Sequence, residues 1–577
     1  CIWMYFSRSN PVVYGMRAIL LLIDDTTHPA SHPIAESSPQ SARKPQVAVS
    51  REGHFQLSTT VAGMFASTFT ADQIRAAEAP LLAAQEFDDQ LMQSAAHAVA
   101  EVAATMLDGR ARVLVVAGPG GNGGDGLYAG AELVLAGHRV EALLPAGKAH
   151  ERALQAFSAA GGEVLDDLPE RDYDLAVDAM TGIGATGEPR ENLHAAVRLL
   201  NTMRAPVLAV DVPTGVEADT GKAAKHHVTA DVTVTFGGWR RAHALAPACG
   251  VQLLADIGLR EQRLHDTLVE QLPTWSHDGP PLLLANRAVL PERIWPEHLH
   301  TLPQAPLLDG TPGPNDDKYS GGVVGIRAGS DGYPGAAVLC VAGAVNATPA
   351  MVRYAGPQAE EVVRAQPEVV ATQTLEDAGR VQAWVFGPGA GTGDDAAREL
   401  QWVLEQDVPV LVDADGLTLL AEHPDLRALV ANREQPTVLT PHDGEFARLR
   451  EVAGVGESDR MTETIALAQA LQATVVRKGR ATVIAHEDDP HTAYAVDAGH
   501  SWAATPGSGD VLSGILGAHL ALMHAKPLGE EAAIAGAVAV HAVAAKLAAH
   551  TPFGDATAPA SRIADYVRPA TAKVHHV

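Results

Sequence analysis

The chain has 577 residues, which is too long for a single hydrophobic core, so we expect two or more domains. Its 42 Lys and Arg residues stand against 69 Asp and Glu residues, a formal net charge of -27, and this excess of acids argues against nucleic acid as a partner because phosphates would be repelled. The three cysteines lie far apart, which argues against a disulfide framework or a structural zinc site and is typical of the reducing cytoplasm.

The amino-terminal part predicts little structure. Residues 1–63 contain scattered Pro, Ser and His without a sustained period, so we expect a disordered extension. Because the chain begins with Cys1 rather than methionine, we interpret Met64 as a candidate for the true start, and we expect removal of residues 1–63 to leave the function of the remaining chain intact. No uninterrupted apolar run approaches the ~20 residues that a membrane span requires, so no membrane partner is expected.

Order is predicted from Thr70 onward. A helical pattern covers residues 74–106, and the β-branched run 112–117 is followed by a glycine-rich turn at 118–126 and another helical stretch. Further strands are predicted at 140–144, 174–178, 207–211 and 232–236. This alternation predicts a doubly wound parallel sheet with helices on both faces. Ligands of such folds bind at the carboxyl ends of the strands, and that is where we find Asp178, Thr181, Gly182, Gly184, Asp211 and Thr214.

A second alternating α/β series begins near Lys318. Residues 271–311, before it, contain Pro, His and Trp without clear alternation, and we interpret them as a linker. Strands are predicted at 322–328, 384–386, 408–413, 438–440, 474–477 and 481–485, and glycine-rich or acidic turns follow several of them. Neither half repeats the motifs of the other, so we expect two different domains, at 64–270 and 312–577.

The second series ends with Thr505-Pro506-Gly507-Ser508-Gly509-Asp510, ahead of an apolar helical run. Glycines at a helix start let several N–H groups approach an anion, for which phosphate is the natural ligand. The carboxylate of Asp510 would stand beside that anion and accept a proton from a hydroxyl that attacks a phosphoryl group. Taken alone, the hexapeptide is explained equally well as a turn that caps a helix.

Longer motifs in both halves resemble known families. The first half resembles the NAD(P)H-hydrate epimerase family through Gly121-Asn122-Gly123-Gly124-Asp125-Gly126. The second half resembles the ADP-dependent NAD(P)H-hydrate dehydratase family through Tyr333-Pro334-Gly335-Ala336-Ala337, Thr440-Pro441-His442-Asp443-Gly444-Glu445 and the closing hexapeptide. The resemblance covers roughly residues 69–567 and implies an α/β fold class: a Rossmann-like doubly wound domain followed by a ribokinase-like α/β domain.

For the first domain, the resemblance implies epimerisation of NADHX and NADPHX, the hydrated forms of NADH and NADPH. The implied substrate contacts are Gly121, Asn122, Gly123, Gly124, Asp125, Gly182, Ile183, Gly184, Ala185, Thr186, Gly187, Glu188 and Asp211. Asp211 is the candidate for acid/base catalysis. The family also binds potassium (K+), and the implied ligands are Asn122, Asp178 and Thr214, whose hard oxygen atoms suit such a cation. Gly121 departs from the family's asparagine, and Arg240-Arg241 stand where a lysine is common.

For the second domain, the resemblance implies dehydration of the S epimer at the expense of ADP, with AMP and phosphate as products. It assigns the nucleotide to Lys478, Gly479, Arg480, Ala481, Thr482 and Gly509, and the hydrated dinucleotide to Ala336, Ala337, Gly389, His442 and Asp510. Phosphorylation would make the C6 hydroxyl a good leaving group, with Asp510 as the general base and Mg2+ accompanying ADP. From the residues alone, a hydrogen-bonding turn at His442 and a simple hairpin at Lys478-Gly479 stay open.

Two other functions are compatible with parts of the sequence. Pyridoxal, hydroxymethylpyrimidine and hydroxyethylthiazole kinases share the Gly-x-Gly-Asp ending, so the second domain could be a vitamin-precursor kinase, although the longer motifs favour repair. An epimerase-like fold also serves as a scaffold in mRNA-decapping enhancers, but Asn122, Asp178 and Asp211 are retained here and the chain is acidic. The sequence does not show whether NADHX or NADPHX is the preferred substrate, or whether ADP or ATP is the nucleotide used. We expect a homo-oligomer, but the sequence does not give its number of copies.

Overall fold

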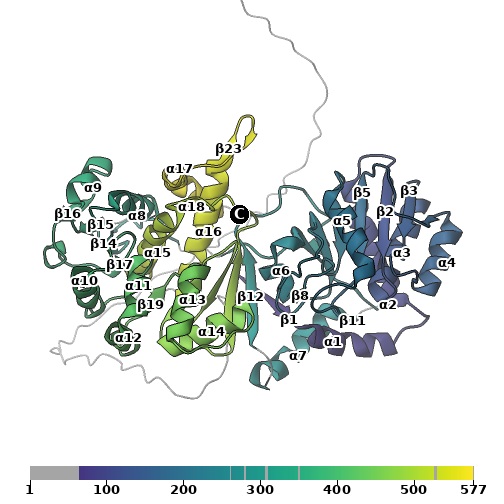
Figure 1. Ribbon diagram of the computed structural model, residues 1–577, viewed down its shortest axis with the longest axis horizontal. Coiled ribbons are helices and arrows are strands. Elements are labelled where there is room, and N and C mark those ends of the chain that lie inside the picture. The colour runs from purple at the N-terminus through teal and green to yellow at the C-terminus, as the bar shows by residue number, and fades with distance from the viewer. Residues whose placement is uncertain are drawn as a thin grey trace, which may run out of the picture. The chain divides into compact units, whose positions relative to one another are not determined.

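The computed structural model describes residues 64–259, 262–278, 281–305, 309–347, 351–525 and 529–575 (Figure 1). The extension predicted at 1–63 lies outside the described residues. Two large α/β sheets, with eight and twelve strands, organise the rest of the chain, and this confirms the predicted fold class.

The eight-stranded sheet belongs to the first half of the chain. Adjacent strands of this sheet are parallel except at one edge, where β13 runs antiparallel to β9. The chain winds outward from β2 through β3 and β4, then returns to β5 and winds the other way, so the switch point lies between β2 and β5. The strand order is β13 (Leu299–His300), β9 (Val251–Ala255), β7 (Val232–Phe236), β6 (Val207–Val210), β5 (Leu175–Ala179), β2 (Arg112–Ala117), β3 (Arg139–Leu143) and β4 (Glu163–Leu165).

Local signals explain the helices around this sheet. The first helix begins with a capping box, in which the hydroxyl of Thr70 accepts from the N–H of Gln73 and the Gln73 side chain accepts from the N–H of Thr70. The described helices are α1 (Ala71–Ala83), α2 (Gln90–Met106), α3 (Gly121–Leu135), α4 (Glu151–Ala160), α5 (His194–Thr202), α6 (Arg241–Leu245) and α7 (Leu264–Asp278).

The glycine run after β2 is a helix start rather than a loop, because α3 begins at Gly121. Close packing requires glycine here. A Cβ on Gly126 would lie 2.5 Å from the Cβ of Ala179 on β5, so α3 lies directly against the sheet. The run therefore places the amino end of a helix at the switch point.

The twelve-stranded sheet contains strands of the second half together with β1 and β8 from the first half at one edge. It is parallel from β16 to β20, and β21 runs antiparallel to both β20 and β22. The strand order is β16 (Val370–Thr372), β15 (Met351–Ala355), β14 (Val323–Arg327), β17 (Ala383–Phe386), β18 (Val410–Val412), β19 (Thr437–Leu439), β20 (Thr474–Arg477), β21 (Ala481–Ala485), β22 (Thr492–Asp497), β12 (Leu282–Arg287), β1 (Ala66–Phe69) and β8 (Trp239–Arg240).

Two of the helices around this sheet cross at glycines. A Cβ on Gly514 of α15 would lie 1.9 Å from the carbonyl oxygen of Cys340 on α8, so only glycine permits the contact. The helices are α8 (Pro334–Ala347), α9 (Ala359–Ala365), α10 (Asp394–Leu404), α11 (Asp415–Glu422), α12 (Pro424–Ala431), α13 (Asp443–Val452), α14 (Arg460–Leu471), α15 (Ser508–Ala525), α16 (Glu530–Ala549), α17 (Ala560–Asp565) and α18 (Val567–His575).

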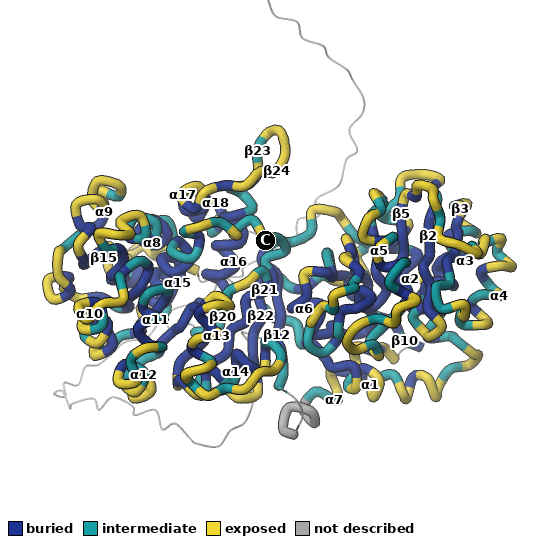
Figure 2. Tube along the Cα trace, in the orientation of Figure 1, coloured by how far each residue is buried: buried dark blue, intermediate teal, exposed yellow. Residues whose placement is uncertain are grey.

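Among the helices that the structure describes, α16 alone has the length and apolar composition to cross a membrane. Within its most apolar stretch, 78% of the residues are buried. It contacts α15, α17 and α18, and Figure 2 shows it largely in the colour of buried residues. Its composition is that of a helix in a protein core.

The segment 271–311, which we expected to be a linker, contains regular structure. β12 pairs in parallel with β22 over six residues and antiparallel with β1. The sequence did not reveal this strand because its apolar run, Leu282 to Ala285, has no alternation and its partners lie far away in the chain. The exact limits of the two domains stay a prediction.

Candidate functional site

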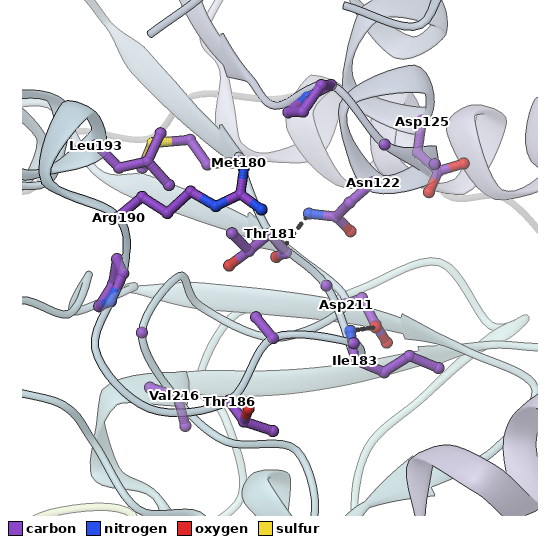
Figure 3. Close-up of a pocket in the computed structure, with 18 of the residues that line it drawn as sticks. Asn122, Asp125, Met180, Thr181, Ile183, Thr186, Arg190, Leu193, Asp211 and Val216 are labelled. Carbon is purple, nitrogen blue, oxygen red and sulfur yellow. Dashed lines mark hydrogen bonds between the residues drawn. The ribbon is translucent and has the colours of Figure 1, made fainter. Parts of the chain in front are cut away.

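A cavity of about 790 Å³ opens at the switch point of the eight-stranded sheet (Figure 3). This is within the usual size of small-molecule sites. Most of the predicted epimerase contacts line it: Gly121, Asn122, Asp125, Asp211 and all seven residues from Gly182 to Glu188. Gly123 and Gly124 have packing roles instead, since a Cβ would lie 1.9 Å from the carbonyl oxygen of Gly118 or 2.5 Å from the sulfur of Met92, respectively.

Asp211 is held firmly at one wall of the cavity. Its φ of 65° lies in the left-handed region, which is costly for a residue other than glycine and is typical of functional positions. Its carboxylate accepts hydrogen bonds from the N–H of Ile183 at 3.2 Å and the hydroxyl of Thr235 at 3.0 Å, and it forms an ion pair with Arg240 at 3.0 Å (Figure 3 shows the Ile183 bond). Arg240 is itself buried.

Two further acids lie near Asp211. Removal from water raises the pKa of Asp125 well above its usual range, and the negative charges of Asp211 and Glu78 add to the effect. Burial also raises the pKa of Glu78, which Arg240 partly offsets. The sequence analysis missed Glu78, because an isolated acid in the middle of α1 carries no motif. An acid that retains its proton beside a paired carboxylate is a suitable arrangement for proton transfer.

The three implied potassium ligands share one hydrogen-bond network. Asp178 is buried and accepts from the N–H and the hydroxyl of Thr214, both at 2.8 Å. The amide of Asn122 donates to the carbonyl of Thr181 at 2.9 Å, and this leaves its own oxygen available. Burial raises the pKa of Asp178 to about 6, so a cation beside it would offset a poorly solvated charge. The donor set fits a hard cation.

In the second domain, Asp510 is the third residue of α15 and lies close to several predicted nucleotide contacts. A Cβ on Gly509 would lie 3.7 Å from the Nζ of Lys478, and that Nζ forms an ion pair with Asp413 at 2.6 Å. The hydroxyl of Ser513 also donates to Asp413, at 2.6 Å. The structure thus brings together the end of β18, the turn after β20 and the start of α15.

The local charges tune Asp510. Removal from water raises its pKa to about 7, the negative charge of Asp413 adds to this, and Lys478 opposes it. Asp413, the last residue of the strand predicted at 408–413, received no role in the sequence analysis. A carboxylate with a pKa near neutrality at the amino end of a helix can act as a general base on a group held by the helix N–H groups.

The other predicted contacts have clear structural positions. A Cβ on Gly389 would lie 2.8 Å from the Cβ of Ala336, so these two residues are neighbours, while Ala337 is buried. His442 caps α13, because its Nδ1 accepts from the N–H groups of Gly444 and Glu445, and its side chain is 61% exposed. This confirms the hydrogen-bonding turn that the sequence left open.

The turn between β20 and β21 is a hairpin, as the alternative interpretation of the sequence expected. The hydroxyl of Thr482 donates to the carbonyl of Gly479 at 3.1 Å, and Arg480 lies 3.5 Å from Asp497. Ala481, the first residue of β21, is buried. The hairpin presents Lys478 toward Gly509 at the start of α15.

Two family models match separate parts of the chain. A family model described as YjeF-related protein N-terminus matches residues 88–242, and one described as NAD(P)H-hydrate dehydratase matches residues 324–567. A solved structure, ADP/ATP-dependent NAD(P)H-hydrate dehydratase from Bacillus subtilis co-crystallized with ATP/Mg2+, is 26% identical, with a TM-score of 0.38, and covers 46% of this chain and 94% of that chain.

Full-length relatives resemble both domains together. The bifunctional NAD(P)H-hydrate repair enzyme Nnr of Corynebacterium glutamicum is 45% identical over 567 residues, which covers 88% of this chain and 98% of the relative. The enzyme of the same name from Mycobacterium tuberculosis is 45% identical over 473 residues, which covers 81% of this chain and 91% of the relative. The chain therefore belongs to the family of bifunctional NAD(P)H-hydrate repair enzymes, with an epimerase domain followed by a dehydratase domain.

Proposed function

We propose that the first domain interconverts the R and S forms of NADHX and NADPHX, and that the second domain dehydrates the S form to NADH or NADPH while ADP is converted to AMP and phosphate. The observation that carries this proposal is the position of Asp510. Its carboxylate has a pKa of about 7 and lies at the amino end of α15, next to Lys478 and Gly509.

In the dehydratase domain, Asp510 accepts the proton of the C6 hydroxyl, and the hydroxyl oxygen attacks the terminal phosphoryl group of ADP, with AMP as the leaving group. The N–H groups of the first turn of α15 hold the phosphoryl oxygens, and Lys478 contributes positive charge. Phosphate then leaves C6 while C5 loses a proton, which restores the double bond. Mg2+ would accompany the nucleotide and offset its charge, and Asp413 offers a nearby carboxylate that could hold it while Asp510 stays free to accept the proton.

In the epimerase domain, Asp211 exchanges a proton with the hydrated ring, and Asp125 holds a proton nearby. Arg240 and Thr235 fix the orientation of the Asp211 carboxylate. Asn122, Asp178 and Thr214 would hold the potassium ion, which supplies positive charge beside the substrate. Fusion of the two domains allows both epimers to be recovered, because the second domain accepts one of them.

Several finer points belong to this proposal. Composition and family resemblance support a cytoplasmic location, a homo-oligomer, ADP as the nucleotide, and no nucleic acid or membrane partner. Each of these points is independent of the assignment of the catalytic acids.

The test uses a mixture of both NADPHX epimers with ADP, Mg2+ and K+, and follows the absorbance of the reduced nicotinamide. The native chain should convert the whole mixture. Asp510→Asn should recover no NADPH, and Asp211→Asn should recover the S share quickly and the R share only at the uncatalysed rate of epimerisation. Asp395→Asn, at an exposed acid on α10, is the matched control. Absence of any recovery with either ADP or ATP would refute the proposal.

A further inference from the structure

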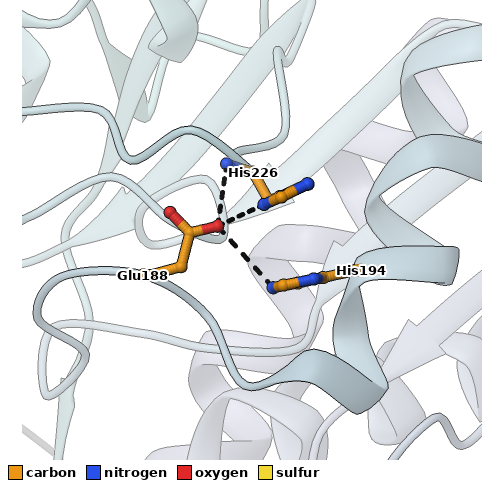
Figure 4. Close-up of side chains that lie close together, drawn as sticks. All are labelled: Glu188, His194 and His226. Carbon is orange, nitrogen blue, oxygen red and sulfur yellow. Dashed lines mark hydrogen bonds and ion pairs between the residues drawn. The ribbon is translucent and has the colours of Figure 1, made fainter.

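Three side chains converge beside the cavity of the epimerase domain: Glu188, His194 and His226 (Figure 4). They come from three separate segments. Glu188 lies in the stretch that lines the cavity, His194 is the first residue of α5, and His226 lies in the loop before β7. Their ligand atoms all lie within 4.8 Å of one another. The fold therefore assembles two imidazoles and one carboxylate at a single point.

One carboxylate oxygen is shared by both rings. The Oε1 of Glu188 forms a hydrogen bond with the Nδ1 of His226 and lies 3.6 Å from the Nε2 of His194. The two rings are stacked, with centroids 4.0 Å apart and an angle of 14° between their planes. The His194 Nε2 also donates to the carbonyl of Pro189 at 2.9 Å.

This arrangement is close to the geometry of a metal site. Metal–ligand distances of ~2.0–2.1 Å in a tetrahedral site place the ligand atoms roughly 3.3–3.4 Å apart. The separation of 3.6 Å between the His194 Nε2 and the Glu188 Oε1 is already similar, whereas the two stacked rings would have to rotate so that a nitrogen of each points at one ion. The other Glu188 oxygen, Oε2, accepts from the N–H of Lys225 at 3.0 Å, which fixes the orientation of the carboxylate in the way that outer partners orient metal ligands.

We propose that Glu188, His194 and His226 form a binding site for a divalent transition metal ion, and that zinc is the ion that fits it best. Two imidazoles and one carboxylate suit zinc, whereas magnesium and potassium prefer oxygen ligands alone. Three protein ligands leave a fourth position for water. The site differs from the oxygen-only set around Asp178 that we assign to potassium.

Zinc would join the cavity-lining segment to its neighbours. Glu188 contributes to the cavity wall, while His194 anchors α5 and His226 anchors the loop before β7. An ion held by all three would therefore fix the end of the segment from Gly182 to Glu188 in place. Because metal binding is measured directly, the proposal can fail or succeed independently of the epimerase activity.

The test measures zinc binding to the metal-stripped full chain by equilibrium dialysis and isothermal titration calorimetry. The native chain should bind one more zinc ion than His194→Asn/His226→Asn. Loss of an outer-shell partner already weakens metal binding by about 10- to 100-fold, so the loss of two direct ligands should weaken this site by more than about 100-fold. Because only an unprotonated imidazole binds a metal ion, zinc affinity should also fall as the pH decreases.

The matched control is His97→Asn. His97 is a 62% exposed histidine of the same domain, and its ring contacts Glu132 at 2.9 Å outside the proposed site. It should bind zinc as the native chain does, and the visible spectrum with Co2+ should show tetrahedral coordination in both. Thermal unfolding of the metal-free native chain and double variant checks that the epimerase domain of the double variant is folded. Equal zinc stoichiometry and affinity in the native chain and the double variant, or equal binding of Mg2+ at this site, would overturn the proposal.

Discussion

Replacement of Asp510 by asparagine should abolish dehydration and also stabilise the dehydratase domain. The loss of activity follows from the proposed role, because a general base contributes about 10²- to 10⁴-fold to a rate. The gain in stability follows from the environment of the carboxylate. It is partly removed from water and faces the negative charge of Asp413. Asparagine keeps the shape of the side chain and removes its charge.

The magnitude can be worked out from the pKa. Asp510 has a pKa of about 7, against an ordinary value of 3.8. At ~1.4 kcal/mol for each pKa unit, the ionised carboxylate lowers the free energy of unfolding by up to about 4 kcal/mol. The folded state binds this proton more tightly than the unfolded state does, so the native chain loses stability as the pH rises from about 4 to about 7. The cost is complete at pH ~8 and absent below pH ~4.

Thermal unfolding of the ligand-free chains measures this difference. At pH ~8 the transition of the dehydratase domain in Asp510→Asn should lie up to roughly 8–16 °C above that of the native chain, since a domain of this size shifts by about 2–4 °C per kcal/mol. At pH ~4 the two transitions should coincide. Asp395→Asn should shift neither, because Asp395 is 93% exposed. An equal difference at both pH values, or none at pH ~8, would refute the electrostatic reasoning.

Three further substitutions test the same physical arguments. The dehydration rate should fall as the pH drops below about 7, because Asp510 then becomes protonated. Lys478 lowers the pKa of Asp510, so Lys478→Met should move the midpoint of this pH profile to a higher pH. An unchanged midpoint would contradict the interaction between Lys478 and Asp510. Asp178→Asn should remove the potassium dependence of epimerisation, measured by a KCl titration at constant ionic strength; persistent dependence would place the ion elsewhere. Gly507→Ala should cost at least about 1 kcal/mol of stability in thermal unfolding, because φ is +81° and Leu339 lies 2.6 Å from the new Cβ; native-like stability would show that the turn relaxes.

The central strands of both sheets were predictable because each is a short β-branched run followed by a glycine-rich or acidic turn. β7, β20 and β21 match their predicted ranges residue for residue. β12 and β22 were missed, because they are parallel partners that lie far apart in the sequence. No local pattern encodes that pairing, and an isolated apolar run is equally compatible with a buried loop or a helix.

The candidate sites were predictable where residue identity alone limits the chemistry, as for the glycines at the start of α15 and the oxygen-bearing residues at the ends of β5 and β6. Glu78 and Asp413 were missed because an acid becomes informative only through its neighbours. Asp413 acquires a role when the fold brings the Nζ of Lys478 within 2.6 Å. His442 is the opposite case: its motif singled it out in the sequence, and the structure shows that its Nδ1 caps a helix.

A chain with a net charge of -27 depends on local positive groups and helix N–H groups to bind anionic nucleotides, and one positive side chain in each site is already paired with an acid. Lys478 is paired with Asp413, and Arg240 with Asp211. A phosphate that binds Lys478 competes with Asp413 for the positive charge of the lysine. The negative charge of Asp413, beside Asp510, is then less well offset. A hard cation that arrives with the nucleotide restores that balance. We infer that nucleotide and magnesium bind the dehydratase domain cooperatively, because each relieves the repulsion that the other would otherwise meet.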